Sequence, residues 1–337
     1  MSLKTLTDSM LPAIETELKR VVGRLDESQS RPYFDMIAYH MGWRGEGSGA
    51  EATGKRIRPL LVLLSCAACD ADWQPALPAA ASVELIHNFS LVHDDIQDYS
   101  ELRRGRLTVW KKWGMPQAIN VGDALFILAH QALLDIKSQF KPEIPLYAGR
   151  IINEACLALS NGQFLDISYE GRTDLTGEDY WPMVSGKTAA LLSACSQVGA
   201  LLGGADEATQ ENFCNFGHYL GLAFQVQDDY LGIWGDSALT GKSTESDLVA
   251  AKKTLPVLFG LAKHGPFAQR WNEGPIKPAE AAALSDLLAA EGAKLYTQEA
   301  ADRMTDLALQ SLRAADPKGE AGDVLFELSS QLLGRQA

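Results

Sequence analysis

The sequence has no surplus of basic residues. Its 30 lysines and arginines face 43 aspartates and glutamates, which gives a formal net charge of −13 at pH 7. Nucleic-acid binding needs basic surface that displaces counterions, so this balance argues against a nucleic-acid partner. It also constrains any anionic substrate, because positive charge must then be supplied locally or by a metal ion.

Cysteine is scarce, and long apolar runs are missing. The five cysteines include a pair at Cys66 and Cys69 that lies inside the apolar segment LLVLLSCAAC, with no second such pair, so we expect core residues. No signal peptide opens the chain, and no uninterrupted apolar run reaches the roughly 20 residues that cross a bilayer. We therefore expect a cytoplasmic protein with reduced thiols and no membrane span.

Two familiar catalytic motifs are also missing. SGKTAA at 185–190 and TGKS at 240–243 resemble the tail of a P-loop, but the required glycine is replaced by Trp181 and Asp236, respectively. Neither segment follows a strand, so nucleotide hydrolysis is not expected. No Ser–His–Asp spacing and no GxSxG elbow occurs.

Alternating β-type runs are nearly absent, and helical periodicity dominates. Segments such as AASVELIHNFSLVHDDI and PQAINVGDALFILAHQALLDI are long and apolar at intervals of three and four residues. Glycine- and proline-rich stretches separate them, and no change in composition marks a linker. We expect a single all-α domain over residues 1–337, with about ten or more helices.

One short stretch, LVHDDIQDYSELRRGRLT at 91–108, gathers three acids. On a helix Asp94 and Asp98 are one turn apart on one face, and Asp95 lies within the same broad arc. Like charges about 4 Å apart repel by about 4 kcal/mol at an effective dielectric near 20, so the group needs water or cations around it. A solvated acidic face is the simple alternative, but the preceding residues are apolar. Oxygen ligands without cysteine favour Mg²⁺.

A second stretch, FQVQDDYLGIWGD at 224–236, repeats part of this pattern. Asp228 and Asp229 form the pair, but the fifth position is Gly232 in place of a third acid. Asp236 lies about 80° around the helix from Asp228, if the helix continues that far. It either replaces the missing ligand or begins the loop at 235–247, which is polar and is either a lid or an exposed connection.

Cationic side chains bracket both acid motifs. Arginine binds phosphate oxygens in pairs, and lysine acts as a point charge. Singly, each is more often a surface charge, and a lone histidine is more often a satisfied core residue. The candidates are Lys55, Arg56, Arg58, His87, Arg103, Arg104, Lys187, Lys242 and Lys252.

Seven blocks occur in a fixed order between Gly54 and Pro256: GKRIRPLL, HDDIQD with LRRGR, GDALF, GQFLD, GKTAALL, FQVQDD, and TGKS with DL and KKTLP. In this order and spacing the motif-bearing part, 54–256, resembles the trans-type polyprenyl diphosphate synthases. The resemblance implies an isoprenoid synthase fold with helices around a central cavity, and a homodimer. It also implies Mg²⁺-dependent, head-to-tail condensation of isopentenyl diphosphate with an allylic diphosphate.

The resemblance further assigns roles to individual residues. About three Mg²⁺ ions would be held with the diphosphate, as hard cations on oxygen ligands. The implied metal ligands are Asp94, Asp95, Asp98 and Asp228, with Asp229 and Asp236 as further candidates. Arg103, Lys187 and Lys242 would contact the allylic diphosphate. Lys55, Arg58, His87 and Arg104 would hold isopentenyl diphosphate. Thr188 and Gln225 would turn their oxygens toward the developing carbocation.

Gly232 departs from the family pattern and leaves two alternatives open. The resulting second motif also resembles that of class I terpene cyclases, but a cyclase has no use for the isopentenyl diphosphate residues, which are all kept. A catalytically silent subunit of a prenyl synthase would be expected to lose the first acid motif, which is intact.

Product length is indicated by the residues just before the first acid motif. Within the family these residues form the floor of the cavity. Here Phe89 lies five residues before Asp94, with the small Ser90 next to it. This combination resembles geranylgeranyl diphosphate synthases, with farnesyl diphosphate as the alternative product. An ordinary core aromatic explains Phe89 equally well.

Overall fold

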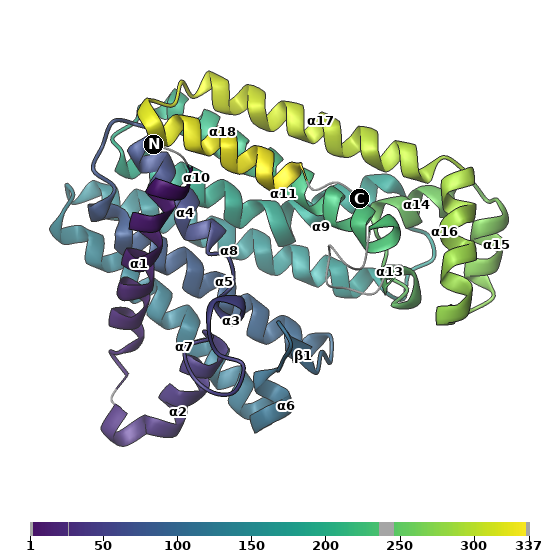
Figure 1. Ribbon diagram of the computed structural model, residues 1–337, viewed down its shortest axis with the longest axis horizontal. Coiled ribbons are helices and arrows are strands. Elements are labelled where there is room, and N and C mark those ends of the chain that lie inside the picture. Colours follow the sequence, from purple (N-terminus) through teal and green to yellow (C-terminus); the bar gives the residue numbers. More distant parts are fainter. Residues whose placement is uncertain (1–2, 26, 236–245, 335–337) are drawn as a thin grey trace. The chain divides into compact units, whose positions relative to one another are not determined.

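The computed structural model describes residues 3–25, 27–235 and 246–334 (Figure 1). The chain divides into two compact units. The first comprises Met1–Asn153, Cys195–Gln210 and Pro317–Leu325, and the second comprises Glu154–Ala194, Glu211–Asp316 and Phe326–Ala337. The single domain expected over 1–337, and its central cavity, stay predictions.

The first unit is helical apart from one short hairpin. Its elements are α1 (Leu3–Val22), α2 (Glu27–His40), α3 (Ala50–Thr53), α4 (Ile57–Ala67), η1 (Gln74–Ala76), α5 (Leu77–Gln97), β1 (Leu102–Arg103), β2 (Arg106–Leu107), α6 (Val109–Trp113), α7 (Met115–Leu134) and η2 (Asp135–Ser138). Four helices contribute residues to both units: α8 (Glu143–Tyr169), α10 (Ala190–Leu202), α11 (Glu207–Trp234) and α18 (Gly319–Leu333). The prediction of an all-α fold is confirmed.

Helix α5 is the core helix of the first unit. It packs on α1, α4, α6 and α7, and Pro78 in its first turn suits a position where a helix has no internal partner for the backbone N–H. Most of its length is buried, whereas its last turn emerges toward solvent, with Asp98 exposed at the C-cap. The first acid motif therefore occupies the point where a buried helix meets water.

Helix α7 differs from the expectation about apolar runs. Together with η2, which follows it, α7 forms the stretch Met115–Ser138, which is long and apolar enough to cross a membrane by length and composition alone. Polar residues interrupt the run, so the sequence does not show it as one continuous apolar segment. In the structure α7 packs along α5, and Val121 and Leu125 are completely buried. A core helix of a globular protein can have the same length and apolar composition as a membrane-spanning helix.

The hairpin was not expected from the sequence. Leu102 pairs with Leu107 and Arg103 with Arg106, so Arg104 and Gly105 form a two-residue turn. Their φ angles of 52° and 72° are both positive, as a type I′ turn requires. The hairpin fixes the backbone that carries the three arginines of the LRRGR block, Arg103, Arg104 and Arg106.

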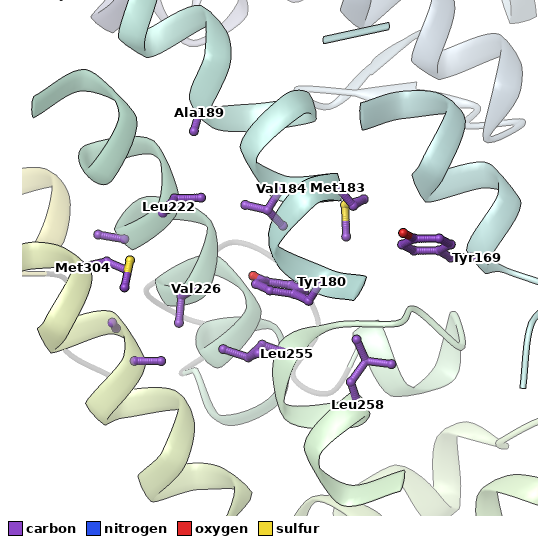
Figure 2. Packing of buried hydrophobic residues seen from close by; sticks show 13 residues of the cluster. Tyr169, Tyr180, Met183, Val184, Ala189, Leu222, Val226, Leu255, Leu258 and Met304 are labelled. Atoms are coloured by element: carbon purple, nitrogen blue, oxygen red, sulfur yellow. The ribbon is translucent and has the colours of Figure 1, made fainter. Parts of the chain in front are cut away.

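The second unit contains the remaining helices. They are α9 (Gly177–Val184), the π-helical segment η3 (Ser185–Ala189), α13 (Ser246–Val249), α14 (Leu255–Ala262), α15 (Pro266–Asn272), η4 (Pro278–Glu280), α16 (Ala281–Ala290) and α17 (Ala293–Ala314). Figure 2 shows apolar side chains of α8, α9, α11, α14 and α17 converging into one cluster, with Tyr180 among them. This core holds α9 and the start of α14 against α11.

A buried ion network joins three helices of the first unit. Arg56, at the N-cap of α4, donates from Nε to Glu15 (2.6 Å) and from Nη1 to Glu84 (2.7 Å). The side chains of Arg56 and Glu84 are 2% and 3% exposed. Arg56 therefore ties α1 and α5 to the loop before α4, which carries Lys55.

We predict that Arg56→Leu strongly destabilises the protein, because it leaves the Glu84 carboxylate buried without its cation. The expected loss is about 3–5 kcal/mol in the free energy of unfolding, measured by urea titration. Arg172→Ala is the matched control, since it removes an exposed arginine from its pair with Asp174. Equal effects of the two changes would show that the network does not stabilise the fold.

Candidate functional site

The first acid motif divides into two exposed or half-exposed acids and one buried acid. Asp98 is exposed and Asp94 is half-buried, whereas Asp95 is 2% exposed. Asp95 Oδ1 accepts a hydrogen bond from Arg103 Nε at 2.8 Å. Burial raises the pKa of Asp95 to about 6, and the Arg103 charge limits that rise. Asp95 thus ties the end of α5 to the hairpin.

The structure gathers the predicted cations of the first unit around this pair. Arg58, Arg103 and Arg104 all lie close enough to His87 to lower its pKa, after burial, which has the largest effect. His87 is therefore a neutral imidazole at pH 7 and not one of the cations. The Arg104 guanidinium lies against Gly54 and donates to the Ala52 carbonyl at 2.8 Å.

His40 belongs to the same group and was missed by the sequence analysis. It lines a pocket with Asp95, Arg103 and Arg104. Burial lowers its pKa to about 3, and the charges of Arg103, Arg104 and Arg56 add to that effect. No local motif marks His40, because it lies far from the other residues in sequence and only the packing of α2 brings it to them.

Three buried polar atoms of this group have no hydrogen-bond partner among the described residues. They are Arg58 Nε, His40 Nε2 and Asp95 Oδ2. A buried polar atom without a partner is rare in a native protein and indicates a bound ligand, ion or water. Arg58 Nε is a donor, and His40 Nε2 is one in the tautomer that carries its proton there, so these two nitrogens and the surrounding guanidiniums suit an anion. Asp95 Oδ2 is an acceptor and suits water or a cation instead. Lys55, at the entrance to α4, is exposed.

The acids of α5 suit Mg²⁺ by their donor chemistry. Asp94 and Asp98 offer hard carboxylate oxygens one helical turn apart, and neither is deeply buried. No three His, Cys, Asp or Glu side chains within 3–25, 27–235 and 246–334 form a group that could hold a metal by themselves.

The second acid pair, on α11, repeats the division seen in the first. Asp228 is half-buried, whereas Asp229 is 4% exposed. Asp229 accepts hydrogen bonds from Gln225 Nε2 (2.9 Å), Tyr180 Oη (2.7 Å) and the Leu255 backbone N–H (3.2 Å). Burial raises its pKa to about 7, against the lowering effect of these donors. Asp229 therefore holds α9, α11 and α14 together.

Lys187 and Thr188 lie on the π-helical segment η3. A π-helix is rare and is often found at functional sites. Lys187 Nζ pairs with Asp166 of α8, and Thr188 donates to Gln225 Oε1 at 2.9 Å. A Cβ on Gly186 would lie 2.5 Å from the Ala158 carbonyl oxygen, so only glycine allows η3 to approach α8 this closely.

Two residues that were not among the predicted site residues contact predicted ones in the structure. Asp166, in the GQFLD block, pairs with Lys187, and Tyr180 supports Asp229. The GQFLD block was itself a signal for Asp166, whereas nothing in the sequence marks Tyr180. Asp236 and Lys242 lie outside the described residues.

Phe89 packs against the neighbouring helix α7. Its ring lies 4.9 Å from that of Phe126, centroid to centroid, and Phe126 lies 4.5 Å from His130. Ser90 donates to the His87 carbonyl within α5. Phe89 is thus part of an aromatic stack between α5 and α7. It precedes Asp94, the first of the acids, by five residues.

Comparison with known proteins finds one family. The polyprenyl synthetase family matches residues 48–282. The (2E,6E)-farnesyl diphosphate synthase of Mycobacterium bovis is 40% identical over 96% of this chain and 91% of its own length. The geranylgeranyl diphosphate synthase of Mycobacterium tuberculosis is 42% identical over 76% of this chain and 73% of its own. The crystal structure of a polyprenyl synthetase from Streptomyces coelicolor superposes with a TM-score of 0.89 at 38% identity, covering 98% and 100% of the two chains.

We predict that His40→Gln changes how stability depends on pH. The folded-state pKa of His40 is about 3, below its ordinary 6.5, so the unfolded chain takes up a proton at His40 before the folded chain does. The contribution of His40 to the free energy of unfolding is complete above pH 6.5. It is lost as the pH falls toward 3, by roughly 1.4 kcal/mol per pH unit.

Urea unfolding of wild type and His40→Gln at pH 8, 6 and 4.5 checks this. As the pH falls from 8 to 4.5, the unfolding free energy of wild type should decrease more than that of His40→Gln. A constant difference over this range would contradict a buried, neutral His40.

Proposed function

The chain belongs to the polyprenyl synthetase family, and from that membership we propose that it joins isopentenyl diphosphate head to tail to an allylic diphosphate. It is a prenyltransferase, and its product is a short-chain trans-prenyl diphosphate. The observation that carries the substrate class is the buried Arg58 Nε, which has no partner among the described residues and lies in a group that also contains the guanidiniums of Arg103 and Arg104. A diphosphate supplies the oxygens and the charge that this group lacks.

The first unit binds diphosphate and metal in this proposal. Lys55, Arg58 and Arg104 hold the diphosphate of isopentenyl diphosphate, and His87 contacts it. Asp94 and Asp98 hold Mg²⁺, and Asp95 fixes the position of Arg103. Mg²⁺, when bound, neutralises charge on the leaving diphosphate. Arg103 does the same through its guanidinium, and this assistance is needed because the protein is itself strongly negative.

The second unit contributes two lysines, an aspartate and two side chains whose oxygens face the reacting carbon in this proposal. Lys187 contacts the allylic diphosphate, as does Lys242, and Asp228 holds a further Mg²⁺, for about three ions in all. Breaking the allylic C–O bond leaves positive charge on the prenyl group. Thr188 Oγ1 and Gln225 Oε1 are held by the chain of hydrogen bonds that ends at Asp229. Their oxygens stabilise that charge without having to reorganise.

The proposal also includes the length of the product, the oligomeric state and the cellular location. We infer geranylgeranyl diphosphate as the main product, with farnesyl diphosphate next; the relatives include synthases of both products. A homodimer is supported by large apolar side chains that α7 leaves exposed: Ile119 at 47%, Ile127 at 56% and Leu134 at 60%. We also infer a cytoplasmic location.

The experiment that tests the function uses purified protein, Mg²⁺ and isopentenyl diphosphate, with allylic primers of five, ten and fifteen carbons in separate reactions. Mass spectrometry should detect a discrete elongated diphosphate. Hydrocarbon or alcohol formed without isopentenyl diphosphate would instead identify a cyclase. Binding of both diphosphates without turnover would identify a catalytically silent subunit.

We predict that Asp94→Asn lowers the turnover rate by about 100-fold or more, because it removes a charged ligand at the leaving diphosphate. Chelation by EDTA should abolish turnover in wild type, and added Mg²⁺ should restore it. Asp306→Asn, at an exposed position of α17, is the control and should leave the rate unchanged. A full rate in Asp94→Asn would contradict its role as a metal ligand.

We also predict that Phe89→Ala lengthens the product, because it removes one ring of the stack with Phe126. Phe126→Ala should act in the same direction. Leu146→Ala, at an exposed position of α8, should leave the product unchanged. Chain lengths are read by mass spectrometry, and an unchanged product from Phe89→Ala would rule out Phe89 as the floor.

A further inference from the structure

Gly232, the residue that breaks the second acid motif, lies beneath a carboxylate from another segment. A Cβ built on Gly232 would lie 2.1 Å from Asp247 Oδ2 and 2.8 Å from Asp247 Cγ. No side chain fits in that space while Asp247 stays in place. Glycine at 232 and aspartate at 247 are therefore coupled in this chain.

The carboxylate of Asp247 stands close to where the missing acid would have placed its own. Residue 232 lies one helical turn after Asp228, so a side chain there would share the face of α11 that carries Asp228. The distance of 2.1 Å from the Cβ position of residue 232 to Asp247 Oδ2 is similar to the distance that separates Cβ from a carboxylate oxygen inside one aspartate side chain. Asp247 thus brings an oxygen to the site of the fifth residue of the motif, from α13.

Charges around Asp247 connect it to the other functional residues of the second unit. Its Oδ1 pairs with Lys252 Nζ at 3.3 Å. Burial lowers the pKa of Lys252, but the charges of Asp247, Asp229 and Asp166 outweigh this and raise it. Asp166 is the partner of Lys187. Asp247 and Lys187 are therefore linked through Asp166, whose charge acts on Lys252 and pairs with Lys187.

We propose that Asp247 supplies the third carboxylate of the second acid motif and holds, with Asp228, the divalent cation of this unit. This inference rests on the proposed function and assigns its second metal site. Two carboxylates, with water and diphosphate oxygens completing the coordination, match the usual protein contribution to a Mg²⁺ site. The glycine does not weaken the motif, because it leaves room for a replacement that comes from a different helix.

The test measures metal binding directly, so that it does not depend on turnover. Mn²⁺ replaces Mg²⁺ as a paramagnetic probe, and bound Mn²⁺ is counted by electron paramagnetic resonance in the presence of inorganic diphosphate. Asp247→Asn should lose one bound Mn²⁺ or weaken it by at least 10-fold. Gly232→Ala should do the same, because its Cβ displaces Asp247.

A transplanted acid distinguishes a ligand from a structural residue. The double variant Gly232→Asp with Asp247→Gly returns the carboxylate to α11 and should recover the Mn²⁺ lost in Asp247→Gly alone. Lys252→Met is the matched control, since it breaks the ion pair of Asp247 but should keep the wild-type Mn²⁺ count.

Two outcomes would overturn the inference. One is unchanged Mn²⁺ binding in Asp247→Asn, and the other is the same loss in Lys252→Met, which would make the ion pair the cause. If wild type still elongates prenyl chains in either case, only this inference fails. If wild type neither binds Mn²⁺ nor forms product, the proposed function fails with it.

Discussion

The helical step of about 100° per residue is the constraint on which both acid motifs depend. Two adjacent aspartates on a helix cannot face the same way. In each pair the first acid is half-buried, and the second is almost completely buried. Asp95 accepts from Arg103, and Asp229 accepts from three donors. The second acid of each pair is thus an anchor for the structure around the first.

This division explains how an acidic protein can concentrate negative charge without losing its fold. Each anchor is a buried carboxylate whose pKa is raised, to about 6 for Asp95 and about 7 for Asp229. Hydrogen bonds offset part of the cost of burying them, one from the Arg103 guanidinium to Asp95 and three to Asp229. The cost of burying them is offset by fixing the elements that carry function: the hairpin with Arg103 in one unit, and the hydrogen-bonded pair of Thr188 and Gln225 in the other.

The sequence was sufficient for the fold class, and it pointed to acids and arginines that the structure brings close together in the first unit. Helical periodicity predicted the helices, and the ordered blocks predicted the acids and the arginines around Arg58. It was not sufficient to separate Asp94 from Asp95, because burial at the end of α5 depends on packing with other elements. The same reason hid His40, which is brought to the arginines by α2.

Local backbone features were also beyond the sequence patterns. Arg104 has a positive φ, which is uncommon for a residue other than glycine, and Lys187 lies on a π-helical segment, which is rare, so neither follows from the usual preferences of these residues. Gly232 looked like a defect in the second motif, since only a spatial neighbour such as Asp247 shows what the missing side chain makes room for. Sequence spacing cannot reveal compensation between residues on different helices.

The most direct test of this account compares Asp228→Asn with Asp229→Asn in two measurements on each protein. Mn²⁺ binding with inorganic diphosphate is counted, and the free energy of unfolding is measured in urea. We predict that Asp228→Asn loses bound Mn²⁺ and keeps its stability, whereas Asp229→Asn keeps its Mn²⁺ and loses about 1–3 kcal/mol, the cost of disturbing a buried hydrogen-bonded group. The reverse pattern would contradict the division between ligand and anchor.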